Sequence, residues 1–302
     1  MKRFSIIIPT YNRPHSLSNC LQALRQLEYP RERFEVILVD DGSTTPLDTV
    51  IESDPPRLDL IKLRTSNGGP AAARNRGAER ASGEFFAFTD DDCRPDEGWL
   101  SNLEDAFRRR PNHMLGGRTV NQLVDNPFST ASQVIVDAAY RFYNRDPDDA
   151  RFVASNNMAV PARLFQDLGG FDSSFRVASE DREVCDRWRF AGHGISYAPQ
   201  AVVYHAHALN LFGFCKQHLN YGRGARRYHA MRACRGSGRL RDDMRFHARL
   251  FQLLRGPLSD LPVRQAVCVG ALLMLWQMSN AAGFLLECVR RTPASGNNVG
   301  YT

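Results

Sequence analysis

Closely spaced cysteine pairs are absent from this sequence. The seven cysteines are scattered, and none forms a Cys-x-x-Cys pair. A disulfide framework or a structural zinc site is therefore not expected, and a reducing compartment fits this cysteine usage better. A long apolar run near the N-terminus is also absent, because the run from Phe4 to Ile8 before Pro9 is too short for a signal peptide. These absences predict a cytoplasmic location.

A strong excess of charge is absent as well. The net charge of +6 suits an anionic ligand or surface, but it is too small to demand nucleic acid. No recognised nucleic-acid motif accompanies it, so nucleic acid is not expected as a partner. The content of 43% hydrophobic and 24% charged residues is ordinary for a globular protein, and 302 residues suffice for one large α/β domain with a smaller appendage.

Short apolar runs alternate with helical patterns in the first third of the chain. The runs predicted to be strands are Phe4–Ile8, Phe34–Val39, Leu58–Leu63 and Phe85–Phe88. The predicted helices start at Pro14, run from about Pro46 to Ser53, and run from Ala71 to Arg80. Connections this short are typical of βαβ units, so we expect a mainly parallel sheet flanked by helices.

A polar cluster follows each of the four predicted strands. The clusters are Thr10–Arg13, Asp40–Asp41, Asn67–Pro70 and Asp90–Asp92. Ligands bind at the carboxyl ends of the strands in such sheets, so the clusters should meet along one edge and form a binding site. A solvated acidic turn would explain the last cluster alone, but it would not explain all four.

The triplet Asp90-Asp91-Asp92 needs a positive partner. Three adjacent carboxylates repel one another, and burying them without compensation is costly. A divalent cation, which prefers oxygen ligands and is often shared with substrate phosphates, is the simplest candidate. Gly68 and the helix start after it would favour an anion, with Arg74 facing a phosphate. A plain turn and a solvated arginine are the alternatives for these two residues.

The order of these motifs resembles the family 2 glycosyltransferases, which have a GT-A fold. The segments that carry the resemblance are Ser5–Arg13, Val39–Ser43, Asn67–Asn75, Thr89–Asp92, Asn156–Ala159, Gly169–Asp172 and Glu180–Asp181, with Arg187 and Gly192 downstream. The resemblance implies a nucleotide-sugar donor, most often a UDP-sugar, and a divalent cation, Mn2+ or Mg2+. It implies Asp92 as the metal ligand, with a nucleotide-binding set of Pro9, Thr10, Tyr11, Arg13, Asp40, Asn67, Gly68, Arg74, Asp90 and Asp91.

The pair Glu180-Asp181 is expected to carry the transfer step. Attack at an anomeric carbon needs a base that takes the proton from the acceptor hydroxyl. In the family this base is the aspartate of the pair, which implies Asp181, with Glu180 beside it, and inversion of configuration at the sugar. Taken alone, the stretch from Ser179 to Glu183 is also typical of a helix start with a serine cap.

A second metal ligand is predicted after the apolar run from Val202 to Tyr204. His205 and His207 follow this run, and a histidine here binds the metal in some relatives. By this resemblance we assign His205 to the metal. An ordinary surface or hydrogen-bonded histidine is the alternative.

The last third of the chain is first basic and then apolar. Arginines outnumber carboxylates between Cys215 and Arg264, and Gln265–Val289 is mostly apolar. A helix of some twenty residues would reach roughly 30 Å, the hydrocarbon thickness of a bilayer. Polar residues interrupt its middle, so we expect peripheral attachment to an anionic membrane at its cytoplasmic face. Packing on the catalytic domain or in a homo-oligomer is the alternative.

The predicted organisation is a GT-A catalytic domain over residues 1–210 and a helical membrane-associated or oligomerisation region over residues 211–302. Residues 1–92 would form the nucleotide-binding half of the catalytic domain, and residues 93–210 its acceptor half. The predicted function is an inverting glycosyltransferase of cell-envelope polysaccharide synthesis, acting on a glycan, lipid-linked or cell-surface acceptor. The alternatives are a nucleotidyltransferase of similar fold, which would not need the Glu180-Asp181 base, and a basic polyanion-binding module.

Overall fold

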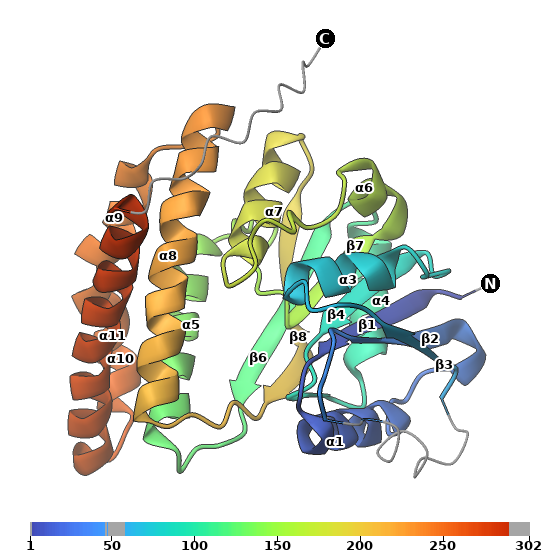
Figure 1. The fold of residues 1–302 in the computed structure, drawn as a ribbon, viewed down its shortest axis with the longest axis horizontal. Helices are drawn as coiled ribbons and strands as arrows, with labels where there is room; N and C mark the ends of the chain where they lie inside the picture. The colour runs from blue at the N-terminus through green and yellow to red at the C-terminus, as the bar shows by residue number, and fades with distance from the viewer. Residues whose placement is uncertain (1, 46, 48–57, 290–302) are drawn as a thin grey trace.

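The computed structural model describes residues 2–45, 47 and 58–289. These residues form an eight-stranded sheet in the order β3-β2-β1-β4-β7-β6-β8-β5, flanked by helices (Figure 1). The strands are β1 (Phe4–Thr10), β2 (Phe34–Asp40), β3 (Leu60–Arg64), β4 (Phe85–Thr89), β5 (Cys93–Pro95), β6 (Met114–Asn121), β7 (Asn157–Pro161) and β8 (Ile195–His205). The α-helices are α1 (Pro14–Arg25), α3 (Pro70–Ala78), α4 (Trp99–Arg109), α5 (Pro127–Tyr143), α6 (Ala162–Asp167), α7 (Glu180–Phe190), α8 (Leu211–Arg235), α9 (Leu240–Ala248), α10 (Leu250–Ser259) and α11 (Val263–Val289).

The four strands predicted from the first third of the chain are confirmed. They lie side by side as β3-β2-β1-β4, and every pairing among them is parallel. The helix predicted from about Pro46 to Ser53 falls almost entirely on residues that the structure does not describe, as does the tail from Pro293 to Thr302.

Both faces of the sheet are buried, as the continuous apolar strands predict. In β1, Phe4, Ile6 and Ile8 pack into one core with α1 and α4, whereas Ile7 packs into a second core on the opposite face. This division follows from the two-residue period of a strand. Full burial of side chains of this size contributes about 1.5–3 kcal/mol each, so the cores hold the strand ends in fixed positions.

The second half of the sheet is mixed. Strand β7 lies between β4 and β6 and is antiparallel to both, while β6 and β8 pair in parallel. The short strand β5, which follows the acidic triplet, pairs antiparallel with the end of β8, placing Cys93 opposite His205. This pairing brings two segments far apart in the sequence to one place beside the triplet.

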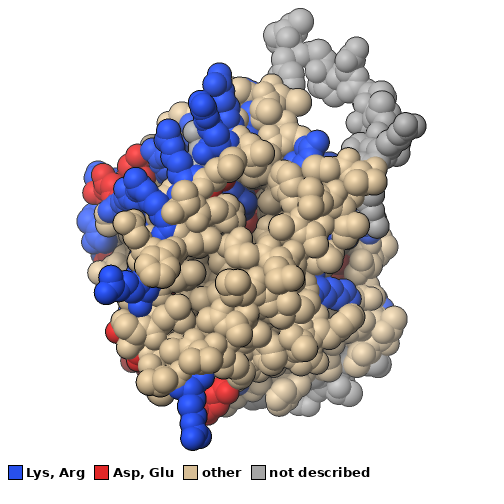
Figure 2. Space-filling view, turned by 90° about the vertical axis from the view of Figure 1, so that its left-hand side faces the viewer, with Lys and Arg blue, Asp and Glu red and all other residues tan. Residues whose placement is uncertain are grey.

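Helices α8, α9, α10 and α11 form a block beside the sheet, on the left of Figure 1. We call these four helices the C-terminal block. Their core includes Phe214, Phe246, Leu272 and Trp276, and α5 contributes to it. Helices α8 and α11 approach so closely that a Cβ atom at Gly222 would lie 1.9 Å from the Asn280 carbonyl oxygen. Figure 2 shows the outer face of this block, which is largely free of charged side chains except along its edges.

Candidate active site

The ends of β1 and β4 are joined by polar side chains. The Oγ1 of Thr10 donates to Asp91 Oδ2 at 2.7 Å, and Arg13 Nη1 lies 3.1 Å from Asp91 Oδ1 and 2.8 Å from Asp92 Oδ2. Asp91 is 3% exposed, and burial raises its pKa to about 6 although Arg13 pulls the pKa down. Arg13 therefore supplies part of the positive charge that the triplet requires.

The glycine loop before α3 is anchored by Asp41. One carboxylate oxygen of Asp41 accepts from the Gly68 amide at 2.7 Å, and the other accepts from the Gly69 amide at 2.9 Å. The side chain of Asn67 donates to the Asp41 carbonyl at 3.1 Å. These two amides therefore serve a carboxylate of the chain itself, and the nucleotide-binding roles of Asn67 and Gly68 stay predictions.

Asp40 lies beside this loop in a turn. Its carboxylate accepts from the Ser43 amide at 2.8 Å and lies 3.2 Å from Arg64 Nη1. Asp40 is therefore engaged in a turn in this structure, which is a common use of an aspartate side chain. The assignment of Asp40 to a nucleobase stays a prediction.

Arg74 connects the acidic triplet to the pair Glu180-Asp181. Its Nη2 lies 2.6 Å from Asp90 Oδ1, and its Nη1 lies 3.0 Å from Glu180 Oε1. The guanidinium is buried, and although burial alone would lower its pKa, the two carboxylates raise the pKa above its ordinary value. A buried charge left without its partner is strongly destabilising, so the ion pairs hold both segments together. The contact joins residues 106 positions apart in the chain.

Asp181 differs from its neighbour because it lacks a cationic partner at bonding distance. Among the described residues, its carboxylate accepts one hydrogen bond, from the Arg182 amide at 2.7 Å. Burial, and then the charge of Glu180, raise the pKa of Asp181 to about 7. Asp181 thus keeps a free oxygen on the wall of the main cavity and titrates close to neutral pH.

The residue before this pair is held in an uncommon backbone conformation. Ser179 has a φ of 75° in the left-handed region, and its side chain makes no capping hydrogen bond. The interpretation of Ser179 as a side-chain cap is therefore wrong, although α7 does start after it. Helix α8 packs directly on this turn, since a Cβ atom at Gly224 would lie 2.5 Å from the Ala178 carbonyl oxygen. The C-terminal block thus supports the segment that positions Asp181.

Asp92 and His205 form a candidate metal pair. The Nε2 of His205 lies 3.2 Å from Asp92 Oδ1. Burial pushes the pKa of Asp92 up, but His205 and Arg13 lower it well below its usual range, so the carboxylate is ionised. Cys93 is adjacent, but burial raises the pKa of its thiol well above the ordinary value, and a protonated thiol is a poor ligand. The carboxylate and imidazole together fit a divalent cation that takes its other ligands from phosphate and water.

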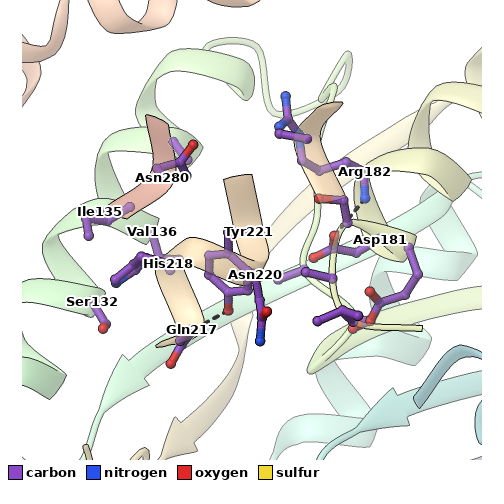
Figure 3. Close-up of a pocket in the computed structure, with 18 of the residues that line it drawn as sticks. Ser132, Ile135, Val136, Asp181, Arg182, Gln217, His218, Asn220, Tyr221 and Asn280 are labelled. Atoms are coloured by element: carbon purple, nitrogen blue, oxygen red, sulfur yellow. Dashed lines mark hydrogen bonds between the residues drawn. The ribbon is translucent and has the colours of Figure 1, made fainter. Parts of the chain in front are cut away.

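One large cavity of about 1460 Å³ joins these features. It is lined by eleven of the predicted site residues, namely Pro9, Thr10, Tyr11, Arg13, Asn67, Arg74, Asp90, Asp91, Glu180, Asp181 and His205. Asp40, Gly68 and Asp92 do not line it. The cavity continues past Asp181 into a space between α5, α8 and α11, where Figure 3 shows Ser132, His218 and Asn280.

Several residues of this arrangement are not predicted from the sequence. Asp41 was recognised only as part of a polar cluster, although its carboxylate holds the glycine loop. The cavity residues of α5, α8 and α11, among them His218 and Tyr221, were not assigned to a site at all. Their only sequence signal is a polar residue within an otherwise apolar or basic helical pattern, which is also typical of ordinary core histidines and glutamines.

Comparison with known proteins gives a family match. Residues 5–169 match the family model described as Glycosyl transferase family 2. The glycosyltransferase AglE of Haloferax volcanii is 27% identical over 73% of this chain and 72% of its own length. The pre-mycofactocin glycosyltransferase of Mycobacterium tuberculosis is 30% identical over 73% of this chain, but this match spans only 46% of that relative.

Solved structures agree at the level of the fold. The mannosyltransferase PcManGT from Pyrobaculum calidifontis, in complex with GDP-Man and Mn2+, superposes with a TM-score of 0.68 at 19% identity. The superposition covers 96% of this chain and 88% of that chain. The predicted GT-A architecture with a C-terminal helical region is therefore confirmed.

Proposed function

The chain belongs to glycosyl transferase family 2 and is a glycosyltransferase, and on that premise we propose that it transfers a sugar from a nucleotide-diphosphate sugar to an acceptor hydroxyl with inversion. The observation that carries the mechanism is the difference between two adjacent carboxylates. Glu180 is neutralised by Arg74, whereas Asp181 has a free oxygen, a pKa raised to about 7 and a place on the cavity wall. Asp181 is the carboxylate suited to accept a proton.

In the proposed step, Asp181 removes the proton from the acceptor hydroxyl as its oxygen attacks the anomeric carbon. The new carbon–oxygen bond forms while the bond from that carbon to the diphosphate breaks, and the electron pair leaves with the diphosphate. Attack from the side opposite the leaving group converts an α-linked donor into a β-linked product. A base with a pKa near the working pH is efficient for such a transfer.

Asp92 and His205 would hold the divalent cation, Mn2+ or Mg2+. When bound, this cation supplies positive charge for the departing diphosphate. The nucleotide would lie at the ends of β1 and β4, along Pro9, Thr10, Tyr11, Arg13 and Asp90. We expect a UDP-sugar, since uridine is the base that the family resemblance favours most. A GDP-sugar is the second candidate, because the PcManGT structure holds GDP-Man.

The donor proposal is tested by a thermal-shift screen of UDP, GDP and dTDP and their sugars, each with and without Mn2+. A ligand that binds only the native state raises its stability in proportion to the log of its saturation. We expect one nucleoside diphosphate to raise the melting temperature, and to do so only with Mn2+. Release of that diphosphate from its sugar supports transfer, whereas release of inorganic diphosphate from a triphosphate would indicate a nucleotidyltransferase. Binding of polyanions alone would indicate a basic module.

We propose that the protein binds its acceptor while attached to an anionic membrane surface. One face of α11 exposes Val263, Val267, Met274, Met278, Leu285 and Val289, residues spaced by four or seven positions that together form one helical stripe. No charged residue occurs between Arg264 and Glu287. The helix is long and apolar enough to cross a membrane, but its other face is in the core of the C-terminal block. We therefore propose that it lies on the cytoplasmic surface of the membrane.

Basic side chains border this apolar face. Arg241, Arg245 and Arg249, on and just after α9, are exposed, and Figure 2 shows Lys and Arg gathered along one edge of the outer face. Such a combination suits anionic lipid, because apolar contact and charge attraction add together.

Flotation with liposomes tests the attachment. Wild type should float with vesicles containing phosphatidylglycerol and float less with phosphatidylcholine alone. The double change Val267→Glu and Met274→Glu should keep the protein in the soluble fraction. Deletion of α11 is a poor test, because it would remove Trp276 from the core. A wild type that ignores vesicles and elutes as a dimer, which the same variant makes monomeric, would assign this face to a second copy.

A further inference from the structure

Three residues with unpartnered buried polar atoms face the cavity beyond Asp181. Within the described part of the chain, the Oγ of Ser132, both ring nitrogens of His218 and the Nε2 of Gln277 have no hydrogen-bond partner. The residues come from α5, α8 and α11, and all line the same cavity. Leaving such groups unpaired is costly, and His218 is only 1% exposed. Their convergence points to a ligand that supplies the missing partners.

Around His218 the cavity wall combines neutral polar side chains with apolar ones, and Lys216 on α8 lines the same cavity. Burial lowers the pKa of His218 to about 4, so at neutral pH the ring offers one donor and one acceptor nitrogen. The rings of Phe214 and Trp276 lie 4.3 and 6.4 Å from the His218 ring. Neutral donors and acceptors on an apolar wall match hydroxyl groups attached to an apolar body. A phosphate would instead be matched by arginine or lysine.

The same space is connected to the candidate base. Figure 3 shows Ser132 and Val136 on α5 near His218, with Tyr221 between them and Asp181. Tyr221 is 43% exposed overall, but desolvation of its phenol, and then the charge of Asp181, raise its pKa, so the phenol is within electrostatic reach of that carboxylate. A molecule held at His218 could therefore extend along Tyr221 to place a hydroxyl at Asp181.

We propose that Ser132, His218 and Gln277 form the acceptor subsite, and that the acceptor is a neutral glycoside with an apolar aglycone. This rests on the glycosyltransferase function proposed above and adds the class of acceptor. The three polar groups bind sugar hydroxyls, and the apolar side chains around them hold the aglycone. The C-terminal helices thus take part in substrate recognition, in addition to any contact with a membrane.

The test compares n-octyl β-D-glycosides of glucose, galactose and N-acetylglucosamine with the matching methyl glycosides, each below its micelle concentration. Binding is measured by calorimetry without donor. We expect at least one octyl glycoside to bind about tenfold more tightly than its methyl partner, which corresponds to burial of about two additional methylene groups. Octyl phosphate, the charged comparison, should bind more weakly than that glycoside.

Two variants connect this binding to the subsite. His218→Phe keeps an aromatic ring but removes both nitrogens, and should weaken octyl glycoside binding about tenfold. Because it removes an unpaired polar group, the melting temperature of the ligand-free protein should stay the same or rise, which a merely structural role for His218 would not give. Ala139→Met narrows the α5 wall of the cavity and should abolish the difference between octyl and methyl glycosides.

The controls separate this subsite from other surfaces. His193→Phe makes the same change beside Trp188, outside the cavity, and Met274→Gln alters the exposed face of α11; neither should change binding. The proposal is overturned when no octyl glycoside binds more tightly than its methyl partner, when octyl phosphate binds better, or when the advantage survives His218→Phe and disappears in Met274→Gln. Failure of the proposed function shows separately, as wild type that binds no nucleoside diphosphate with Mn2+.

Discussion

The two sides of the cavity differ in how their polar groups are satisfied. On the proposed donor side, Thr10, Arg13 and Arg74 hold the carboxylates of the Asp90–Asp92 triplet in hydrogen bonds and ion pairs. The carboxylate of Asp41 there accepts from the Gly68 and Gly69 amides. On the acceptor side, Asp181 keeps a free oxygen, and Ser132 and His218 have buried atoms without partners in the described residues.

The two sides should therefore depend on their ligands to different extents. A network of satisfied groups fixes its own geometry, so we expect the proposed donor side to be organised before a nucleotide binds. Unpaired groups gain their partners only when a ligand binds, so under the proposed assignment we expect the acceptor side to set specificity. Substitutions on the two sides should therefore separate donor binding from transfer.

The largest expected effect is that of Asp181→Asn. Transfer should fall by about 10²–10⁴-fold because the acceptor hydroxyl loses its base, while the affinity for donor stays within a few fold. Steady-state kcat and calorimetric donor affinity measure the two quantities. The exposed change Asp167→Asn serves as the control for loss of a carboxylate. Loss of donor binding in Asp181→Asn would make Asp181 a ligand or fold residue, and near-normal transfer would remove it as the base.

Asp92→Asn should affect the proposed donor side of the cavity. An amide cannot replace the anionic ligand, so Mn2+-dependent binding of the nucleoside diphosphate should weaken by about 10–100-fold or more. Binding of octyl glycosides should not change, since Asp92 does not line the cavity that contains that subsite. Donor titrations at several Mn2+ concentrations measure the effect. A variant with wild-type Mn2+ dependence would show that the metal site has been misplaced.

Gly224→Ala should disturb the contact between α8 and the Ser179 turn, which positions Asp181. The added Cβ atom would lie 2.5 Å from the Ala178 carbonyl oxygen, so α8 or the Ser179 turn must shift. A displacement of the catalytic group by about 1 Å can cost on the order of 10²-fold, and we expect transfer to fall about 10-fold or more with donor affinity kept. Gly270→Ala, which meets nothing within 4 Å, is the matched control and should leave transfer unchanged. Equal losses of donor binding and transfer would refute a local effect on Asp181.

The smallest expected effect is the change that Asp181→Asn makes to the pH dependence of the melting temperature. The pKa of Asp181 is raised from 3.8 to about 7 in the folded state, so between these values the folded protein binds more protons than the unfolded chain. The raised pKa of Asp181 therefore adds to the free energy of unfolding at low pH, and this contribution is lost as the pH rises through about 7. Asp181→Asn lacks this loss, so its melting temperature relative to wild type should increase from pH 5 to pH 8. A constant difference across that range would contradict the raised pKa.

The sequence by itself determined the strands, their polar ends and the order of the motifs. Alternation and apolar runs are local signals, and strand ends near Thr10, Asp40 and Thr89 follow from them directly. The family resemblance added the pair Glu180-Asp181 and its proposed role in the transfer step. These features were accessible because each is encoded within a few neighbouring residues.

The tertiary structure alone decided which polar groups meet. Arg74 reaches Glu180 across 106 positions, β7 enters the sheet antiparallel between β4 and β6, and α5, α8 and α11 enclose the space around His218. Such contacts depend on how packed elements are oriented in space, and a local periodicity carries no information on that orientation. For the same physical reason, two adjacent carboxylates differ in the fold although both line the cavity: Glu180 is paired with the buried Arg74, whereas Asp181 has no cation at bonding distance among the described residues.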